Sequence, residues 1–178
     1  MTIDVDLLAQ AALGSGAGAG AQELPVDSRA NLQRAVSVLL SIGRRRLDFA
    51  DRDLSRFDLT LKTHVDRLEQ ILLSDRLACV RILVDDTAWL DAHAARLKHL
   101  QRTFSHCLRM RQSAAEDPVG DDAFAVVDAV HGLALRPGEL VAGSLWLNSP
   151  RALRPWRDSF DRRWDAASHD LAVFALGL

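Results

Sequence analysis

The eight residues LACVRILV, at positions 77–84, form an almost unbroken apolar run in which Arg81 is the single charged residue. A run of this length predicts a strand that is buried on both faces of a sheet, as in proteins of the α/β class. Apolar residues recur at helical spacing before this run, over 64–73, and after it, between residues 89 and 100. A buried strand between two amphipathic helices predicts an α/β fold.

The elements expected on either side complete this pattern. The apolar spacing predicts a first helix that begins at Asp27 or Ser28 and ends at Gly43, and a short strand follows it over 46–50. A meander of strands and a last helix follow, over 105–111, 123–130, 132–135 and 140–147 and from Ser149–Pro150 onward. We therefore expect a single mixed β-sheet flanked by helices, in which strand 123–128 lies next to strand 77–84.

The composition is that of one domain of ordinary polarity. The 178 residues suit a single domain, the formal net charge is −2, and no apolar run approaches the 18 residues of a spanning helix. We expect residues 1–24 to form a flexible tail with a Gly/Ala linker, and residues 25–178 to form the domain. Asp4 and Asp6 stand where an export signal needs basic residues, so we expect a cytoplasmic location and no membrane contact.

Most of the charged, aromatic and cysteine residues are expected to have structural roles. The densest basic stretch, over 44–56, interleaves arginine with aspartate, which favours pairing within the chain over binding to nucleic acid. Trp156 and Trp164 lie on the apolar stripe of the last helix and are expected in the core. Cys79 and Cys107 are expected to be buried free thiols, because one pair without a CxxC motif makes no disulfide framework.

Several short phrases, taken in their order along the chain, carry a family resemblance. They are LDFADRDL at 47–54, VRILVDD at 80–86, AVVD at 125–128, Gly143-Ser144 with Asn148, and FxxxW at 160–164. Over residues 29–168 this order resembles one half of the phospholipase D-like fold, and it is most similar to a proteobacterial phospholipase D-like domain of unknown function. That domain also follows GNAT-type acetyltransferase domains. The resemblance therefore implies a protein partner, with an acetyltransferase-type protein as one choice, or a homodimer.

The resemblance also bears on catalysis. Active members of the superfamily use the motif HxKxxxxD twice, so that a histidine attacks phosphorus and a lysine holds the phosphate charge. If Asp128 is aligned with the final aspartate of the motif, Asp121 takes the histidine position and Ala123 takes the lysine position. No histidine of the chain is followed by lysine two residues later. The resemblance thus implies a domain without this phosphodiesterase chemistry, and we expect no catalytic residue, cofactor or metal.

We expect a catalytically degenerate domain that acts as a binding or regulatory module. The sequence does not identify its ligand or partner. Two alternatives also stay open, so the chain is not excluded as an enzyme. One is an enzyme with a replaced carboxylate site, with or without a metal, built from Asp51, Asp85, Asp121 or Asp128. The other is a nucleic-acid-binding module that uses Arg44–Arg46 and Arg52.

Six residues are candidates for a cleft or a ligand-binding site, namely Arg52, Asp53, Asp85, Asp128, Ser144 and Asn148. Arg52, Asp53 and Asp85 follow predicted strands, and ligands of α/β sheets bind at the carboxyl ends of strands. A competing interpretation makes Asp85 the N-cap of the next helix and Asp128 a structural residue at a strand end. Ser144 and Asn148 resemble the GSxN tail of the superfamily, but three residues separate them in place of one.

Overall fold

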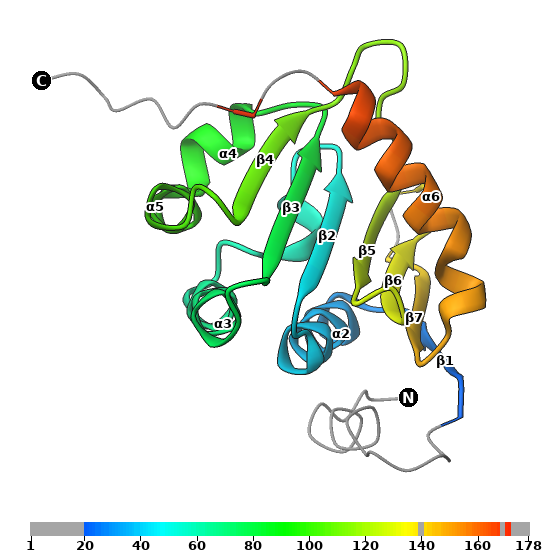
Figure 1. Ribbon diagram of the computed structural model, residues 1–178. Helices are drawn as coiled ribbons and strands as arrows, with labels where there is room; N and C mark the ends of the chain where they lie inside the picture. The colour runs from blue at the N-terminus through cyan, green and yellow to red at the C-terminus, as the bar shows by residue number, and fades with distance from the viewer. Residues whose placement is uncertain (1–19, 139–140, 168–169, 172–178) are drawn as a thin grey trace, which may run out of the picture.

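The computed structural model describes residues 20–138, 141–167 and 170–171, and these form one seven-stranded mixed sheet (Figure 1). The strand order is β1-β7-β6-β5-β2-β3-β4. The strands are β1 (Gln22–Val26), β2 (Arg46–Asp51), β3 (Cys79–Val84), β4 (Leu108–Gln112), β5 (Ala123–Val127), β6 (His131–Leu135) and β7 (Gly143–Leu147). Strands β2, β3 and β4 run parallel, whereas every other neighbouring pair is antiparallel. The predicted α/β class with a single mixed sheet is confirmed.

The predicted neighbourhood of strands 123–128 and 77–84 is wrong, because β2 lies between β5 and β3. Phe49 of β2 pairs with Ala125 of β5 on one side and with Ile82 of β3 on the other. The short run over 46–50 is therefore an interior strand of the sheet. The position of β2 between β5 and β3 depends on pairing between residues far apart in the chain. The pattern of apolar and polar residues along one strand does not specify that pairing.

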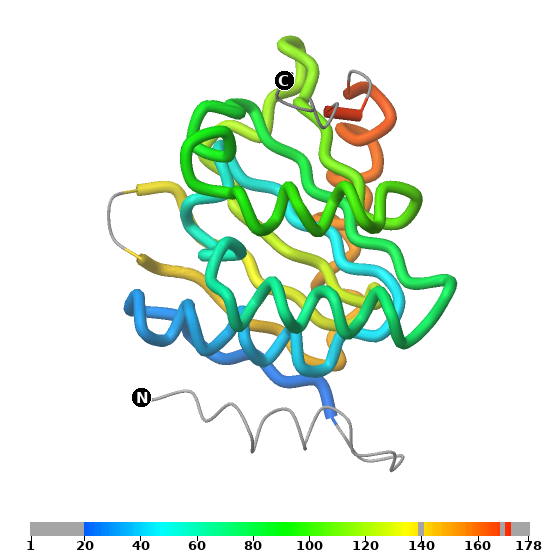
Figure 2. The backbone as a smooth tube through the Cα atoms, turned by 90° about the vertical axis from the view of Figure 1, so that its left-hand side faces the viewer, coloured from blue at the N-terminus to red at the C-terminus, as the bar shows by residue number. Residues whose placement is uncertain are grey.

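Helices cover both faces of the sheet (Figures 1 and 2). One face is covered by α2 (Arg29–Ile42), α3 (Lys62–Ser74), α4 (Ala88–His93) and α5 (Ala95–Thr103), and the other by α6 (Pro150–Ala166). The larger core lies on the first face and includes Leu39 and Phe49, whereas Phe124, Phe160 and Trp164 belong to a smaller core under α6. Alternate residues of one strand enter different cores, which explains why residues 78–84 are apolar almost throughout, whereas exposed Leu77 enters neither core.

Helix α2 begins and ends where the sequence predicts. The Oγ of Ser28 accepts the backbone N–H of Asn31 at 3.3 Å, and the N–H of Gly43 donates to the Leu39 carbonyl at 2.9 Å. The single helix predicted between residues 89 and 100 is instead two helices, which meet at Ala94 with φ −100° and ψ 32°. Apolar spacing continues across Ala94, which is itself buried, so the pattern contains no sign of the break.

Strand β1 has no counterpart among the predicted elements, and it starts the sheet at Gln22 instead of near Pro25. It pairs antiparallel with β7, from Gln22 opposite Leu147 to Val26 opposite Gly143. Its sequence QELPV has no alternating apolar pattern, and proline is tolerated in strands at the edge of a sheet. Residues 1–19 of the predicted tail lie outside the described residues, so the tail stays a prediction.

The tryptophans of α6 pack as predicted. The ring of buried Trp164 stacks on Phe160 with centroids 5.6 Å apart, and that of half-buried Trp156 lies 5.1 Å from Phe124. Cys107 is buried just before β4 and Cys79 is half-buried at the start of β3, and both are free thiols. None of the described helices has the length and apolar character needed to cross a bilayer.

Candidate functional site

A hollow of about 340 Å³ opens at the carboxyl end of β2, beside the start of β5. It is lined by Arg52, Asp53, Ser55, Arg56, Asp121 and Gly138. The carboxyl ends of strands are the usual place for ligands in open α/β sheets. We call this feature the β2 hollow and treat it as the candidate functional site.

Arg56 ties the end of β2 to the start of β5. Its Nε donates to Oδ1 of buried Asp51 at 2.7 Å, and its Nη atoms donate to the backbone carbonyls of Asp121 and Asp122 at 3.1 and 3.2 Å. Burial raises the pKa of the Asp51 carboxyl, and the Arg56 guanidinium opposes that effect. Since these partners already occupy Arg56, this side chain shapes the wall of the hollow and offers little free charge to a ligand.

The backbone between β2 and α3 is held in an uncommon conformation. Leu54 and Asp58 have φ of 72° and 51°, in the left-handed region that residues other than glycine seldom adopt. Leu54 is 0% exposed, and the Asp53 carboxylate accepts the backbone N–H of Ser55 at 2.9 Å. Burial and this hydrogen bond keep the segment in place, so Arg52 and Asp53 stand on a fixed turn at the hollow.

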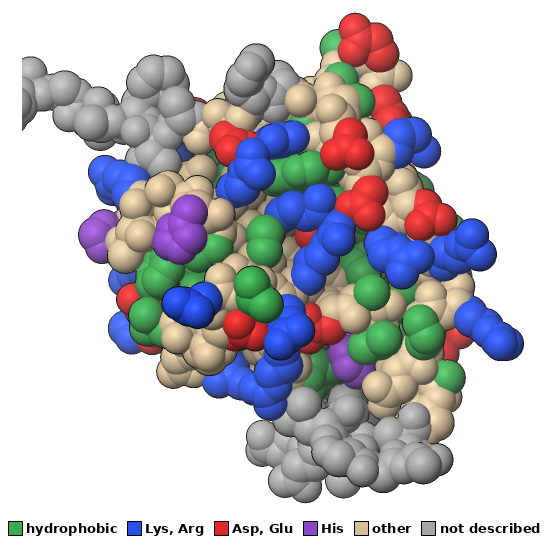
Figure 3. All heavy atoms as spheres, in the orientation of Figure 1, with side chains coloured by type: hydrophobic (Ala, Val, Ile, Leu, Met, Phe, Trp, Pro, Cys, Tyr) green, Lys and Arg blue, Asp and Glu red, His purple; other side chains and the backbone are tan. Residues whose placement is uncertain are grey.

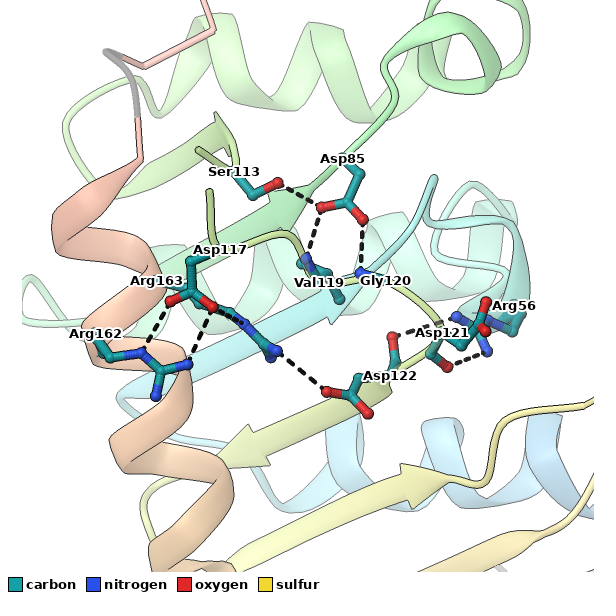
Figure 4. Close-up of polar contacts among 10 residues, drawn as sticks. All are labelled: Arg56, Asp85, Ser113, Asp117, Val119, Gly120, Asp121, Asp122, Arg162 and Arg163. Carbon is teal, nitrogen blue, oxygen red and sulfur yellow. Dashed lines mark hydrogen bonds and ion pairs between the residues drawn. The ribbon is translucent and has the colours of Figure 1, made fainter. Parts of the chain in front are cut away.

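Asp85, at the end of β3, anchors the loop that leads to β5 (Figure 4). Its carboxylate accepts the N–H groups of Val119 and Gly120, each at 2.7 Å, and the hydroxyl of Ser113. The interpretation of Asp85 as a helix N-cap is therefore wrong. It is Asp86 whose carboxylate accepts the N–H of Ala88, at 2.8 Å, near the start of α4.

Two arginines of α6 hold the same loop from the other side (Figure 4). Arg162 donates to both carboxylate oxygens of Asp117, at 2.9 and 3.1 Å, and Arg163 pairs with Asp117 and with Asp122 at 3.3 Å. These hydrogen bonds hold the pKa of the Asp117 carboxyl below its usual range. The loop over 113–122 is thus fixed at both ends, and it places Asp121 at the rim of the β2 hollow.

The structure brings only part of the predicted set together. Arg52 and Asp53 line the hollow, and Asp85 lies beside them, since its N–H donates to the Arg52 carbonyl at 2.9 Å. Ser144, in β7 opposite Ala134, is not among the residues that line the hollow.

Asp128 and Asn148 lie at the opposite end of the sheet. The Asp128 carboxylate accepts the backbone N–H groups of Arg44, Arg45 and Arg46 at 2.8 to 2.9 Å, in a turn where Asp128 itself has φ 51°. Asn148 donates its N–H to Nδ1 of His131 at 3.2 Å. Both contacts are within the fold. The structural interpretation of Asp128 fits this geometry.

Three groups of the β2 hollow carry charge that is open to a ligand. Among the described residues, the exposed side chains of Arg52 and Asp121 have no ion-pair or hydrogen-bond partner, and Asp53 uses its carboxylate only for the local turn. The hollow therefore offers one guanidinium and two carboxylates. Within the described part of the chain, no three His, Cys, Asp or Glu side chains are grouped so that they could hold a metal ion.

A second set of charges lies under α6 and is paired throughout. Asp48 accepts two hydrogen bonds from Arg81, at 2.7 and 3.0 Å, and one from Arg46 at 2.8 Å, while Asp161 of α6 pairs with both arginines. We call these four residues the α6-face cluster. Burial raises the pKa of Asp48 to about 7, Arg46 opposes that rise, and the Asp161 charge adds to it. Basic side chains on this face lie next to acidic ones (Figure 3).

The pairing predicted for the basic stretch is confirmed for Arg46 and Arg56, which bind Asp48 and Asp51. Arg45 pairs with Asp75, which lies outside the stretch. Four of the six residues lining the hollow, Ser55, Arg56, Asp121 and Gly138, were not among the six candidates, although Asp121 was named for the alternative enzyme site. No local pattern marks Ser55 or Gly138. Their place in the hollow depends on contacts between distant segments.

Solved structures place this chain among the phospholipase D-like folds. NUC from Salmonella typhimurium, a phospholipase D family member, superposes with a TM-score of 0.61 at 12% identity, over 85% of this chain and 97% of its own. Phosphatidylserine synthase from Haemophilus influenzae Rd KW20 gives 0.56 at 13% identity, over 85% of this chain and 40% of its own. TrmBL2, an archaeal chromatin protein with a novel mode of DNA binding, gives 0.62 at 13% identity over 92% of this chain. The chain spans 59% of the TrmBL2 chain.

The family itself is shown by the sequence match. Residues 28–176 match the model of the Domain of unknown function (DUF7931), and the chain belongs to that family. No curated protein matches the sequence significantly. The phospholipase D-like fold expected from the resemblance is therefore confirmed, while the proteobacterial relative stays a prediction.

Proposed function

We propose that this chain is a phospholipase D-like domain that binds a protein partner at the β2 hollow and does not cleave phosphodiesters. The observation that carries the proposal is the place of Asp121. The resemblance puts the nucleophilic histidine at this position, and Asp121 lies at the rim of the hollow with a free carboxylate. Ala123, at the lysine position, is 0% exposed and carries no charge for a phosphate. A carboxylate in place of the histidine, with no cation in place of the lysine, repels a phosphodiester.

The absence of phosphodiesterase activity is tested with the purified full chain and bis(p-nitrophenyl) phosphate. We expect no release of nitrophenol above that of heat-denatured protein, for the native chain and for Asp121→Ala alike. A phospholipase D-like enzyme with an intact HxKxxxxD motif serves as the positive control. Cleavage by the native chain that Asp121→Ala reduces would contradict the proposal.

The mixed charge of the hollow supports a protein as the ligand. A surface with one guanidinium and two carboxylates complements a segment that carries both signs, and such complementarity gives specificity in protein recognition. A charge-reversed variant, Arg52→Glu with Asp121→Lys, tests this proposal in capture from the native host, with and without residues 1–19, which precede β1. Arg154→Glu is the matched control, because Arg154 is an exposed arginine on α6. We expect the partner to be lost only with the charge-reversed variant, and equal capture by all forms would exclude the hollow. A homodimer and an acetyltransferase-type partner remain predictions.

Nucleic acid binding is a second candidate, favoured by one specific observation. Among the described residues, the exposed side chains of Arg44 and Arg52 have no acidic partner. TrmBL2, which shares the fold, is described as binding DNA. Fluorescence anisotropy with a labelled 20-base-pair duplex tests this function between 50 and 200 mM salt. Binding that weakens with salt, and that Arg44→Glu with Arg52→Glu abolishes, would support it. No binding at 50 mM salt would exclude it.

A further inference from the structure

The outer edge of β4 is occupied by the chain's own residues Asp170 and Leu171. β4 is the last strand of the sheet and pairs with β3 on its inner side. On the outer side, Asp170 forms an antiparallel bridge with Arg111, and the N–H of Leu171 donates to the Met110 carbonyl at 2.8 Å. An edge strand presents backbone groups to which another extended segment can pair. Among the described residues, the chain thus places two of its own, Asp170 and Leu171, at this edge.

The side chain of Asp170 is held by two arginines of β4. The Nε atoms of Arg109 and Arg111 each donate to one oxygen of its carboxylate at 2.7 Å. Arg111 is fixed in turn, because its guanidinium lies 4.6 Å from the centroid of the Trp164 ring and donates to the Trp164 carbonyl at 2.9 Å. Arg109 has no other ion-pair partner among the described residues. Two arginines at alternate positions of a strand therefore form a carboxylate-binding fork.

The side chain of Leu171 supplies an apolar contact next to this fork. It packs against the larger core, and its carbonyl accepts the side-chain N–H of Gln101 in α5 at 3.3 Å. A second hollow of about 340 Å³ continues from Asp170 and Leu171 between α5 and β4, where Ser105 and Leu108 are among the lining residues. Within the described part of the chain, the space beside β4 thus extends past Asp170 and Leu171.

We propose that this edge is a docking site for an extended segment of a partner protein in which an acidic residue is followed by a large aliphatic one. Asp170 and Leu171 are the chain's own occupant of that site, and the partner segment replaces them. The backbone of β4 binds an extended chain, the fork of Arg109 and Arg111 binds a carboxylate, and the contact beside Gln101 takes an aliphatic side chain.

A nucleic acid would use only one of these three features. A phosphate can bind the arginine fork, but it leaves the backbone of β4 and the apolar contact without partners. The observed occupant uses all three features at once. The observations therefore favour a peptide, and this site is separate from the β2 hollow.

The experiment uses the full chain and a fluorescein-labelled peptide SHDLAV, copied from residues 168–173. In the native chain, Asp170 and Leu171 compete from within the molecule, at an effective concentration of order mM. The variant Asp170→Asn with Leu171→Ser weakens this competitor. We expect the variant to bind the peptide at least about tenfold more tightly than the native chain does. Arg109→Gln added to the variant is expected to abolish that gain, and Arg154→Gln is the matched control.

Two altered peptides and one oligonucleotide decide the chemistry of the occupant. SHNLAV and SHDSAV, which lack the carboxylate or the aliphatic side chain, are each expected to bind at least about tenfold more weakly than SHDLAV. Peptide binding is also expected to slow hydrogen exchange of residues 108–112. The proposal is overturned if the folded variant fails to bind SHDLAV, or if the altered peptides bind equally well. It is also overturned if a 12-nucleotide single strand binds through Arg109 and SHDLAV does not.

Discussion

The β2 hollow and the α6-face cluster are both built from arginine and aspartate. The charged side chains of the cluster are paired with one another, whereas two of those in the hollow have no partner within the described part of the chain. In the cluster Asp48 is 1% exposed, and each of the four charged side chains has an ion-pair partner. In the hollow Arg52 and Asp121 have none among the described residues. Composition is therefore a poor guide to function in this chain. What separates a structural charge from a candidate binding charge is whether the fold has already supplied its partner.

The largest expected effect comes from breaking the cluster. Asp48→Leu leaves the Arg81 guanidinium, 13% exposed, without its two hydrogen bonds to Asp48. We expect the free energy of unfolding, measured by urea denaturation, to fall by about 3 kcal/mol, since Arg81 then keeps only its ion pair with half-exposed Asp161 and a poorly paired buried charge is costly. Adding Arg81→Met should recover most of that loss, because an apolar pair replaces the ion pair. Equal instability of the single and double variants would contradict this account.

The next effect concerns the loop that carries Asp121 to the hollow. Asp85→Ala removes three hydrogen bonds to Ser113, Val119 and Gly120, and we expect a loss of about 2 kcal/mol in the free energy of unfolding. Hydrogen exchange over 113–122 should become faster. Asp86→Ala is the control, because it removes only the contact to Ala88 and should leave this loop protected. Unchanged exchange in Asp85→Ala would show that the α6 arginines hold the loop by themselves.

The pH dependence of stability also distinguishes the α6-face cluster from the β2 hollow. The pKa of Asp48 is about 7 in the folded protein and 3.8 in its ordinary state, so between these values the folded chain binds the extra proton. Stability from this group is therefore present at low pH and is lost as pH rises from about 4 to about 7. The raised pKa of Asp51 acts in the same direction, whereas the lowered pKa of buried His131 acts in the opposite direction.

We expect the free energy of unfolding to fall by about 1 to 2 kcal/mol between pH 5 and pH 8. Asp48→Asn removes the titrating group and should flatten the dependence, which urea denaturation across this range measures. A slope that Asp48→Asn leaves intact would assign the effect to other groups. The α6-face cluster would then contribute no pH dependence.

The smallest effect on stability is expected at the hollow. Arg52→Gln and Asp121→Asn remove charges without partners, so each should change the free energy of unfolding by less than about 0.5 kcal/mol. The same variants are expected to lose binding of the proposed partner, because the hollow then lacks its free charges. A loss of stability near that of Asp48→Leu would mean that the two regions do not differ as described.

The rule that ligands bind at the carboxyl ends of strands predicted part of the candidate site. Arg52 and Asp53 were predicted because they follow a strand, and they do line the hollow. Asp128 and Asn148 also follow strands, but β5 and β7 run antiparallel to β2, so their carboxyl ends lie at the opposite end of the sheet. The rule that ligands bind at carboxyl ends holds for parallel strands. Strand direction cannot be read from a local pattern.

The sequence by itself determined the α/β class, most helices and strands, and the absence of HxKxxxxD, because these depend on neighbouring residues and on the spacing of apolar side chains. Tertiary structure decided the order and direction of the strands, the join of β1 to β7, and which charges found partners. Those properties depend on residues far apart in the chain. Asp48 and Asp121 are the same residue type, but the pairing of β2 with β3 puts Arg81 beside Asp48, whereas no described side chain pairs with the Asp121 carboxylate.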